Sequence, residues 1–249
     1  MRPLLTLALL CALPSSSAAK SPLIVLDPGH GGTNRGAYGA TIGQHEKALT
    51  LKLARRIAFF LRELKAPARV RLTRNRDRYL TLARRATLAN SWSGTLFVSL
   101  HFNASQSRTQ SGFETYVLNA KASDREASRL AQLENGTREQ QPRGRDAVGA
   151  ILADLEQRAM YARSRRLAKQ VQGALRQARP KAADRGVREA PFDVLMGLKM
   201  PGVLVEAGFI DHPDESRELN QATTFDAIAQ AIAKGITSYL RRPKKVARR

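Results

Sequence analysis

Short apolar segments alternate along the chain with segments whose apolar residues recur every three or four positions. The short segments are typical of strands buried in a sheet, and the others of helices that pack one face against it. Strands are predicted at residues 23–26, 69–72, 95–100, 113–118 and 203–205, and helices at residues 47–64, 80–92 and 225–240. This order predicts an α/β fold with a twisted, mostly parallel or mixed central sheet flanked by helices.

The segment between residues 119 and 185 is polar, charged and helix-prone. It contains predicted helices at residues 122–133 and 147–178, separated by a Pro- and Gly-containing loop at residues 139–146. The first helix is expected to end at Glu134-Asn135-Gly136, because glycine commonly follows a helix. The chain of 249 residues is long enough for one core and short for two. We therefore interpret residues 119–185 as a helical insertion before the last strands of a single domain.

The first 19 residues have the pattern of an export signal. Arg2 supplies a positive charge, residues 4–13 are apolar but too short to cross a bilayer, and Ser17-Ala18-Ala19 suit cleavage. A buried N-terminal helix is one alternative. Lipid modification of Cys11 is another, although two bulky leucines precede this cysteine. We expect a mature chain from Lys20, exported to the periplasm (or secreted where there is no outer membrane), monomeric and without a stable membrane anchor.

Composition and charge narrow the chemistry further. The one cysteine lies in the signal, so the mature chain would have no disulfide, thiolate metal site or cysteine nucleophile. The formal net charge is +21, and +20 without Arg2, which suits nucleic acid, an anionic membrane or an acidic polymer. Much of this charge could also be a solvated surface. Export argues against nucleic acid and favours the polyanionic bacterial cell wall. Residues 241–249 form a basic tail beyond the domain, which spans residues 20–240.

Two of the four histidines lie at the ends of predicted strands. His30 lies in the turn Asp27-Pro28-Gly29-His30-Gly31-Gly32, and His101 follows the apolar run of residues 95–100. The glycines allow the backbone to approach a ligand closely, at the sheet edge where open α/β folds bind ligands. Alone, His101 would more often be a histidine satisfied within the core. Two histidines at two strand ends favour a shared site.

Two carboxylates have comparable positions. Glu46 opens the first predicted helix, where it could be a metal ligand or merely interact with the helix dipole. Glu206 follows the strand at residues 203–205, and a buried carboxylate needs a partner. Three protein ligands with one open position is the pattern of catalytic zinc sites, and it leaves a fourth group for proton transfer. His45 should point away from its neighbour Glu46, and His212 is expected in an exposed turn.

In order and spacing, the chain resembles the zinc-dependent N-acetylmuramoyl-L-alanine amidases known as the Amidase_3 family, from about residue 23 to residue 240. The segments that carry the resemblance are Leu26 to Gly32, Glu46, Leu72-Thr73-Arg74 with Asp77, Leu82 with Arg85 and Ala89-Asn90, Val98 to Ala104, Gly112 to Tyr116, and Val203 to Ile210. The resemblance implies that His30, Glu46 and His101 bind zinc and that Glu206 is the catalytic glutamate. It implies hydrolysis of the bond between the lactyl group of N-acetylmuramic acid and L-alanine in peptidoglycan.

Further residues receive roles from the same resemblance. Asp27 and Asn103 are candidates for orienting the ligands, although Asp27 could simply stabilise the Pro-Gly turn. Arg74 and Arg85 are expected to hold the structure together. The helical insertion is similar to that of Gram-negative amidases that separate daughter cells, in which it covers the active site until an activator protein removes it. We hypothesise that Glu134 reaches the zinc and blocks its open position; the alternative is a solvated acid on a surface helix.

Other functions remain to be weighed against this one. A zinc carboxypeptidase-like peptidoglycan hydrolase could use two histidines and a glutamate, but it would lack the glycine-turn context. A non-catalytic wall-binding module would be expected to have lost part of the set, yet all four residues are present. A nucleic-acid binder would need recognition motifs and no export signal.

Overall fold

The computed structural model describes residues 21–105, 107–136 and 147–241, and for residues 147–157 the description is limited to the backbone. The predicted export signal with Cys11, the predicted loop at residues 139–146 and residues 242–249 of the basic tail lie outside these ranges. Within the described ranges, no helix is both long enough and apolar enough to cross a membrane.

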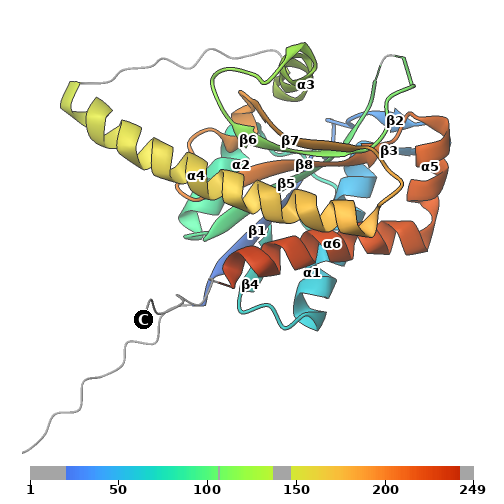
Figure 1. Ribbon diagram of the computed structural model, residues 1–249, viewed down its shortest axis with the longest axis horizontal. Helices are drawn as coiled ribbons and strands as arrows, with labels where there is room; N and C mark the ends of the chain where they lie inside the picture. Colours follow the sequence, from blue (N-terminus) through green and yellow to red (C-terminus); the bar gives the residue numbers. More distant parts are fainter. Residues whose placement is uncertain (1–20, 106, 137–146, 242–249) are drawn as a thin grey trace, which may run out of the picture.

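A six-stranded sheet forms the centre of the fold, in the order β4-β1-β5-β8-β6-β7 (Figure 1). Its strands are β1 (Leu23–Pro28), β4 (Arg69–Leu72), β5 (Leu96–Asn103), β6 (Phe113–Leu118), β7 (Asp184–Ala190) and β8 (Gly202–Phe209). Strands β4, β1, β5 and β8 are parallel, whereas β6 is antiparallel to β8 and parallel to β7. This confirms the predicted mixed, mostly parallel sheet. The carboxyl ends of the four parallel strands meet at one edge, where open α/β sheets bind ligands.

Helices cover both faces of the sheet (Figure 1). One face packs against α1 (Glu46–Glu63), α4 (Ala147–Ala178) and α6 (Ala222–Leu240), and the other against α2 (Leu82–Ser91), α3 (Arg125–Asn135) and the 3-10 helix η1 (Asp193–Leu195). The short helix α5 (Pro213–Asn220) precedes α6, and the two-stranded hairpin β2 (Tyr38–Gly39) and β3 (Gln44–His45) precedes α1.

Strand β1 shows why the apolar runs predict strands. Its residues Ile24 and Leu26 belong to the core beneath α1, and the alternate residues Leu23 and Val25 belong to the core on the opposite face. A strand covered on both faces needs apolar residues at every position, which is the pattern in the sequence. Strand β7 is absent from the predicted elements, because its sequence is polar and most of its side chains are only half-buried at the sheet edge.

The predicted helices at residues 122–133 and 147–178 correspond to α3 and α4. The second half of α4 buries Leu167, Val171 and Leu175 in the core that it shares with α6. Gly235 of α6 permits this packing, because a Cβ there would lie 2.6 Å from the Cα of Val171. Residues 119–185 are therefore not one appended unit: α4 is part of the main core, and residues 184–185 begin β7.

Candidate metal centre and active site

The turn after β1 brings His30 to the carboxyl edge of the sheet. The backbone has positive φ at three successive residues, His30 (59°), Gly31 (126°) and Gly32 (57°). For a histidine this conformation costs roughly 1–2 kcal/mol and persists only where the surroundings hold it. Here the guanidinium of Arg85 donates to the carbonyl oxygen of His30 at 2.7 Å. The glycines after His30 let the chain continue through the turn.

His101 lies in β5 beside this turn and is almost fully buried. The backbone at Gly29 passes directly against its ring, since a Cβ on Gly29 would lie 2.5 Å from Cε1 and Nε2 of His101. Only glycine allows this approach. The imidazole rings of His30 and His101 consequently lie 4.9 Å apart between centroids, at a steep angle.

Glu46 joins the two imidazoles. It is the first residue of α1 and is 1% exposed. Its Oε2 lies 2.9 Å from Nε2 of His30, and its Oε1 lies 3.2 Å from Nδ1 of His101. Backbone amides of Ala37 and Phe102 also donate to its two oxygens. Burial alone would raise the pKa of Glu46, but the two imidazoles outweigh it and hold that pKa well below its ordinary value.

Glu134, near the end of α3, completes a cluster of four. Its Oε2 lies 3.5 Å from Nε2 of His30 and 3.1 Å from Nδ1 of His101. One ligand atom from each of the four residues lies within 4.8 Å of all the others. Ligands at about 2.0–2.2 Å from a tetrahedral zinc would be about 3.3–3.6 Å apart. The observed separations of 2.9, 3.1, 3.2 and 3.5 Å, which involve both oxygens of Glu46, are at or somewhat below this range, so the cluster could hold a metal ion after small adjustments.

The protonation of His30 gives an independent test of that fit. Oδ1 of Asn34 lies 2.9 Å from Nδ1 of His30 and also accepts from the backbone amide of Gly36, which identifies it as the acceptor. Nδ1 therefore carries a proton. Nε2 makes no hydrogen bond among the described residues, although a carboxylate oxygen of Glu46 lies 2.9 Å away. A buried imidazole nitrogen that faces a carboxylate calls for a positive charge there, either a metal cation or a second proton on the ring.

Without a metal cation, protons on the two imidazoles would have to balance the carboxylate charges. Burial lowers the pKa of both imidazoles, but the nearby carboxylates outweigh it and raise the pKa of His30, and that of His101 more strongly. Asn34, which contacts the candidate ligand His30, was not identified by the sequence reasoning. Its signal is an amide four residues after the histidine, inside the same glycine-rich turn.

Glu206 lies beside the cluster without being part of it. Its Cα is in register with His101 of β5 and with Glu114 of β6, so the three side chains leave the sheet on the same face. Glu206 is fully buried, and neither carboxylate oxygen has a hydrogen-bond partner among the described residues. Burial raises its pKa well above the ordinary value, and neighbouring carboxylates add to this effect although His101 opposes it.

Asp27, Arg74 and Arg85 hold the turn in place. Asp27 accepts from Arg85 Nη1 and from Ser99 Oγ, both at 2.9 Å. Arg74 is fully buried and donates to the carbonyl oxygens at positions 28, 29 and 47. These contacts stabilise the turn, and Asp27 reaches His30 only through Arg85, which holds the histidine carbonyl.

Among the described residues, Asn103 hydrogen-bonds to Glu114 and to none of the candidate metal ligands. Its Nδ2 donates to Oε1 of Glu114 at 2.9 Å. The other oxygen of Glu114 accepts from Arg185 and Arg188 of β7. Arg188 also pairs with Asp124, the residue that caps the N-terminus of α3. This polar network was not predicted, and it fastens the start of α3 to the sheet.

The end of α3 closes the site. Asn135 donates to the carbonyl oxygen of Pro191 at 2.9 Å, and its Oδ1 accepts from the amide of Asp193 at 2.8 Å. Beside His101 and Glu134 there remains a cavity of about 10 Å³. Such a volume has room for about one water molecule, and none for a peptide.

The two other histidines lie outside the cluster, as expected. His45 caps α1 and packs against the ring of Tyr38. His212 is half-buried and begins α5, where its Nδ1 accepts from the amide of Glu215. The expected exposed turn at His212 is therefore a helix cap.

Known proteins are similar to this chain over most of its length. Residues 24–238 match the N-acetylmuramoyl-L-alanine amidase family. The amidase AmiC of Escherichia coli O6:H1 is 32% identical over 249 residues, which cover 95% of this chain and 57% of that protein. The amidase AmiA of Escherichia coli K12 is 34% identical over 226 residues, which cover 87% of this chain and 75% of that protein. The chain thus spans little more than half the length of the AmiC relative.

Solved structures show the same similarity. An N-acetylmuramoyl-L-alanine amidase from Clostridium difficile 630 superposes with a TM-score of 0.69 at 30% identity, over 91% of this chain and all of that chain. The CwlD amidase from Clostridioides difficile, solved in complex with the GerS lipoprotein, gives a TM-score of 0.63 at 26% identity, over 88% of this chain and 98% of that chain. With the family match across nearly the whole described fold, the chain belongs to the N-acetylmuramoyl-L-alanine amidase family.

Proposed function

We propose that the chain is a zinc-dependent hydrolase of the amide bond between N-acetylmuramic acid and L-alanine in peptidoglycan. We infer that it is exported and acts in wall remodelling or daughter-cell separation. The observation that carries the proposal is the convergence of His30, Glu46 and His101 on one position, beside a buried Glu206 without a hydrogen-bond partner. The identity of the bond that is cleaved is taken from the family match and from the names of the relatives.

Three candidate ligands would bind the zinc ion, and neighbouring groups orient them. A zinc ion bound by His30, Glu46 and His101 would supply a Lewis acid that polarises the scissile carbonyl and makes water acidic enough to attack near neutral pH. Asn34 keeps the proton on Nδ1 of His30, so that Nε2 faces the ion. Two backbone amides fix the carboxylate of Glu46 between the two histidines.

We assign the proton transfer to Glu206. Amide hydrolysis must remove a proton from the attacking water and deliver one to the leaving nitrogen. The carboxylate oxygens of Glu206 have no other hydrogen-bond partner among the described residues, so they are free for the water and then for the nitrogen of L-alanine. Glu114, the neighbour in register on β6, is instead held by two arginines and an asparagine.

We further propose that the structure is a closed resting state. A catalytic zinc site keeps one position open; Glu134 would occupy that position, because its Oε2 lies 3.5 Å from Nε2 of His30 and 3.1 Å from Nδ1 of His101. The carboxylate would therefore act as a blocking fourth ligand. An activator protein that moves α3 would expose the ion to peptidoglycan. The complex of the related CwlD amidase with the GerS lipoprotein is a precedent for a partner protein.

The test is digestion of purified peptidoglycan by zinc-loaded protein, with zinc quantified per chain. The parent, the unblocked Glu134→Gln variant and the double variant Glu134→Gln with Glu206→Gln are compared. We expect Glu134→Gln to release intact stem peptides with a free L-alanine amine, and the double variant to release none. Release of single C-terminal amino acids would instead support the carboxypeptidase alternative. Binding without any cleavage, with zinc bound and α3 unblocked, would support a non-catalytic wall-binding module.

A further inference from the structure

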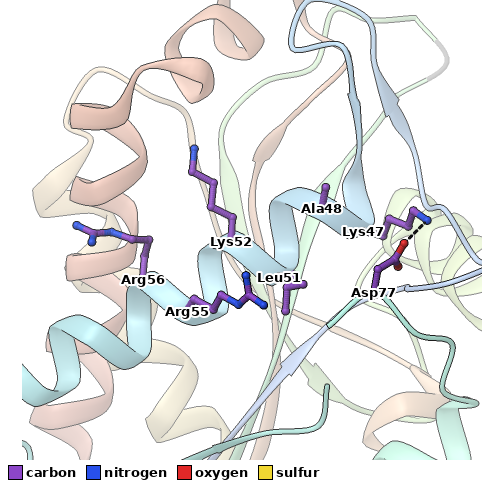
Figure 2. Close-up of a pocket in the computed structure, with 7 residues that line it drawn as sticks. All are labelled: Lys47, Ala48, Leu51, Lys52, Arg55, Arg56 and Asp77. Atoms are coloured by element: carbon purple, nitrogen blue, oxygen red, sulfur yellow. Dashed lines mark hydrogen bonds and ion pairs between the residues drawn. The ribbon is translucent and has the colours of Figure 1, made fainter. Parts of the chain in front are cut away.

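A groove lined by residues of α1 and by Asp77 runs along the helix from Lys47 to Arg56 (Figure 2). Its volume is about 370 Å³, which is within the range of pockets that bind small ligands. Lys47, Lys52, Arg55 and Arg56 extend from the helix around it, and Leu51 lies between them. The groove is therefore an apolar strip bordered by four cationic side chains.

Two of these four cations are neutralised within the protein. Lys47 Nζ pairs with Asp77 at 2.7 Å, the contact drawn in Figure 2. Arg56 makes a two-pronged contact with both carboxylate oxygens of Asp226 on α6, at 2.7 and 2.6 Å. These two pairs form the ends of the groove and contribute little net charge.

Lys52 and Arg55 differ, because neither has a carboxylate partner among the described residues. The ammonium of Lys52 lies 4.4 Å from the centre of the Phe225 ring, and Arg55 donates to the backbone carbonyl of Asn75. Both side chains are exposed. Residues three apart on a helix are neighbours, and like charges in such positions repel each other. The middle of the groove therefore has two positive charges that only an external anion can neutralise.

The groove and the candidate active site share the start of α1. Lys47 follows the ligand Glu46 directly, and its ammonium also donates to the carbonyl oxygen of Gly32, in the turn that carries His30. Arg55 lies nine positions beyond Glu46, about 13 Å along the axis at 1.5 Å per residue. A substrate bound at the cluster could thus extend into the groove.

We propose that the α1 groove binds the carboxylates of peptidoglycan stem peptides that neighbour the bond to be cleaved. This rests on the proposed function, since peptidoglycan supplies the peptides. Arg55 offers a planar fork that matches a carboxylate, and Lys52, which leaves the helix in a different direction (Figure 2), offers a point charge for a second one. Leu51 and Ala48 provide an apolar surface for the aliphatic parts of the peptide. The groove positions the substrate and takes no part in bond cleavage.

The test compares two double variants that remove the same charge. Lys52→Gln with Arg55→Gln removes the unpaired cations of the groove. Arg163→Gln with Lys169→Gln removes one arginine and one lysine from exposed positions on α4, remote from the groove. Co-sedimentation with purified peptidoglycan at low salt measures affinity, and thermal unfolding checks that both variants are folded. A second sample of peptidoglycan has its carboxylates converted to neutral amides.

We expect the groove variant to bind about tenfold more weakly, equivalent to about 1.4 kcal/mol, and the α4 variant to bind like the parent. On the amidated peptidoglycan the groove variant and the parent should bind equally. An equal loss in both variants would overturn the proposal in favour of general surface charge. A groove-specific loss that survives amidation would overturn it in favour of a phosphate-bearing polymer.

The outcome for the groove is separable from that for the amidase activity. If zinc-loaded Glu134→Gln releases no stem peptides but the groove variant still loses carboxylate-dependent binding, the proposed activity fails and the groove stands. If stem peptides are released and the groove variant binds like the parent, the proposed activity stands and the groove fails.

Discussion

Removing the side-chain amide of Asn135 should open the candidate active site. This residue donates to the carbonyl of Pro191 at 2.9 Å and accepts from the amide of Asp193 at 2.8 Å, and so holds the end of α3 against the segment before η1. Asn135→Ala removes both contacts but leaves Glu134 and the buried face of α3 unchanged. Alanine is also the better helix former, so the helix itself is not weakened.

The magnitude follows from the two contacts. A neutral hydrogen bond contributes roughly 1 kcal/mol net, so the closed arrangement loses about 2 kcal/mol. At 1.4 kcal/mol per factor of ten, the ratio of open to closed protein rises about 30-fold. If only the open form cleaves peptidoglycan, hydrolysis should rise by up to the same factor while the open form remains the minor one.

The assay is dye release from labelled peptidoglycan by zinc-loaded protein, with hydrogen exchange of the α3 amides followed in parallel. Asn220→Ala is the matched control, because Asn220 is an exposed asparagine at the end of a different helix, α5. Faster exchange in α3 without faster hydrolysis would refute the gating role of this helix. Unchanged exchange would refute the idea that these two hydrogen bonds hold it.

Three further predictions test the packing and the network. Gly29→Ala places a Cβ 2.5 Å from the ring of His101, so zinc affinity should fall at least about tenfold in competition with a chelator; unchanged affinity would contradict the described approach. Gly235→Ala overpacks α6 against the α4 backbone and should lower the free energy of unfolding by about 1–3 kcal/mol. Gly173→Ala, where an added Cβ would have nothing within 4 Å, should raise the free energy of unfolding by about 0.5–1 kcal/mol. Thermal unfolding of the two variants measures the difference. The hydrogen bond from Arg188 lowers the pKa of Asp124, so its stabilisation of α3 is complete above about pH 5 and is lost as pH falls through and below about pH 4; exchange of α3 amides should respond to acid there, and Asp124→Asn should remove the response.

The residues of the candidate site that could be predicted from the sequence are those at the ends of strands. His30, His101 and Glu206 each follow an apolar run, and a buried run that ends in a polar side chain points to the carboxyl edge of the sheet. Glu46 is less visible, since a glutamate at a helix start commonly serves the helix dipole. The family resemblance identified it as a ligand, and its burial between two imidazoles fits that role.

The remaining features depend on contacts that sequence patterns do not encode. Arg188 and Glu114 lie 74 positions apart and meet only because β6 and β7 pair at the sheet edge. β7 itself is too polar to stand out as a strand. Asn34 acts through a single hydrogen bond across a turn. The long α4 was predicted as a helix, but the sequence did not reveal that its second half belongs to the main core.

Helix α3 is also part of the protein's interior. Ala127, Leu130 and Ala131 on its inner face belong to the same core cluster as Phe192 and Leu204. Moving the helix away would bring this apolar surface into water, at about 25 cal/mol for each Å² exposed. An open enzyme would consequently be prone to self-association unless another protein covered the uncovered surface. The same few side chains would therefore affect both the solubility of the open form and its access to substrate.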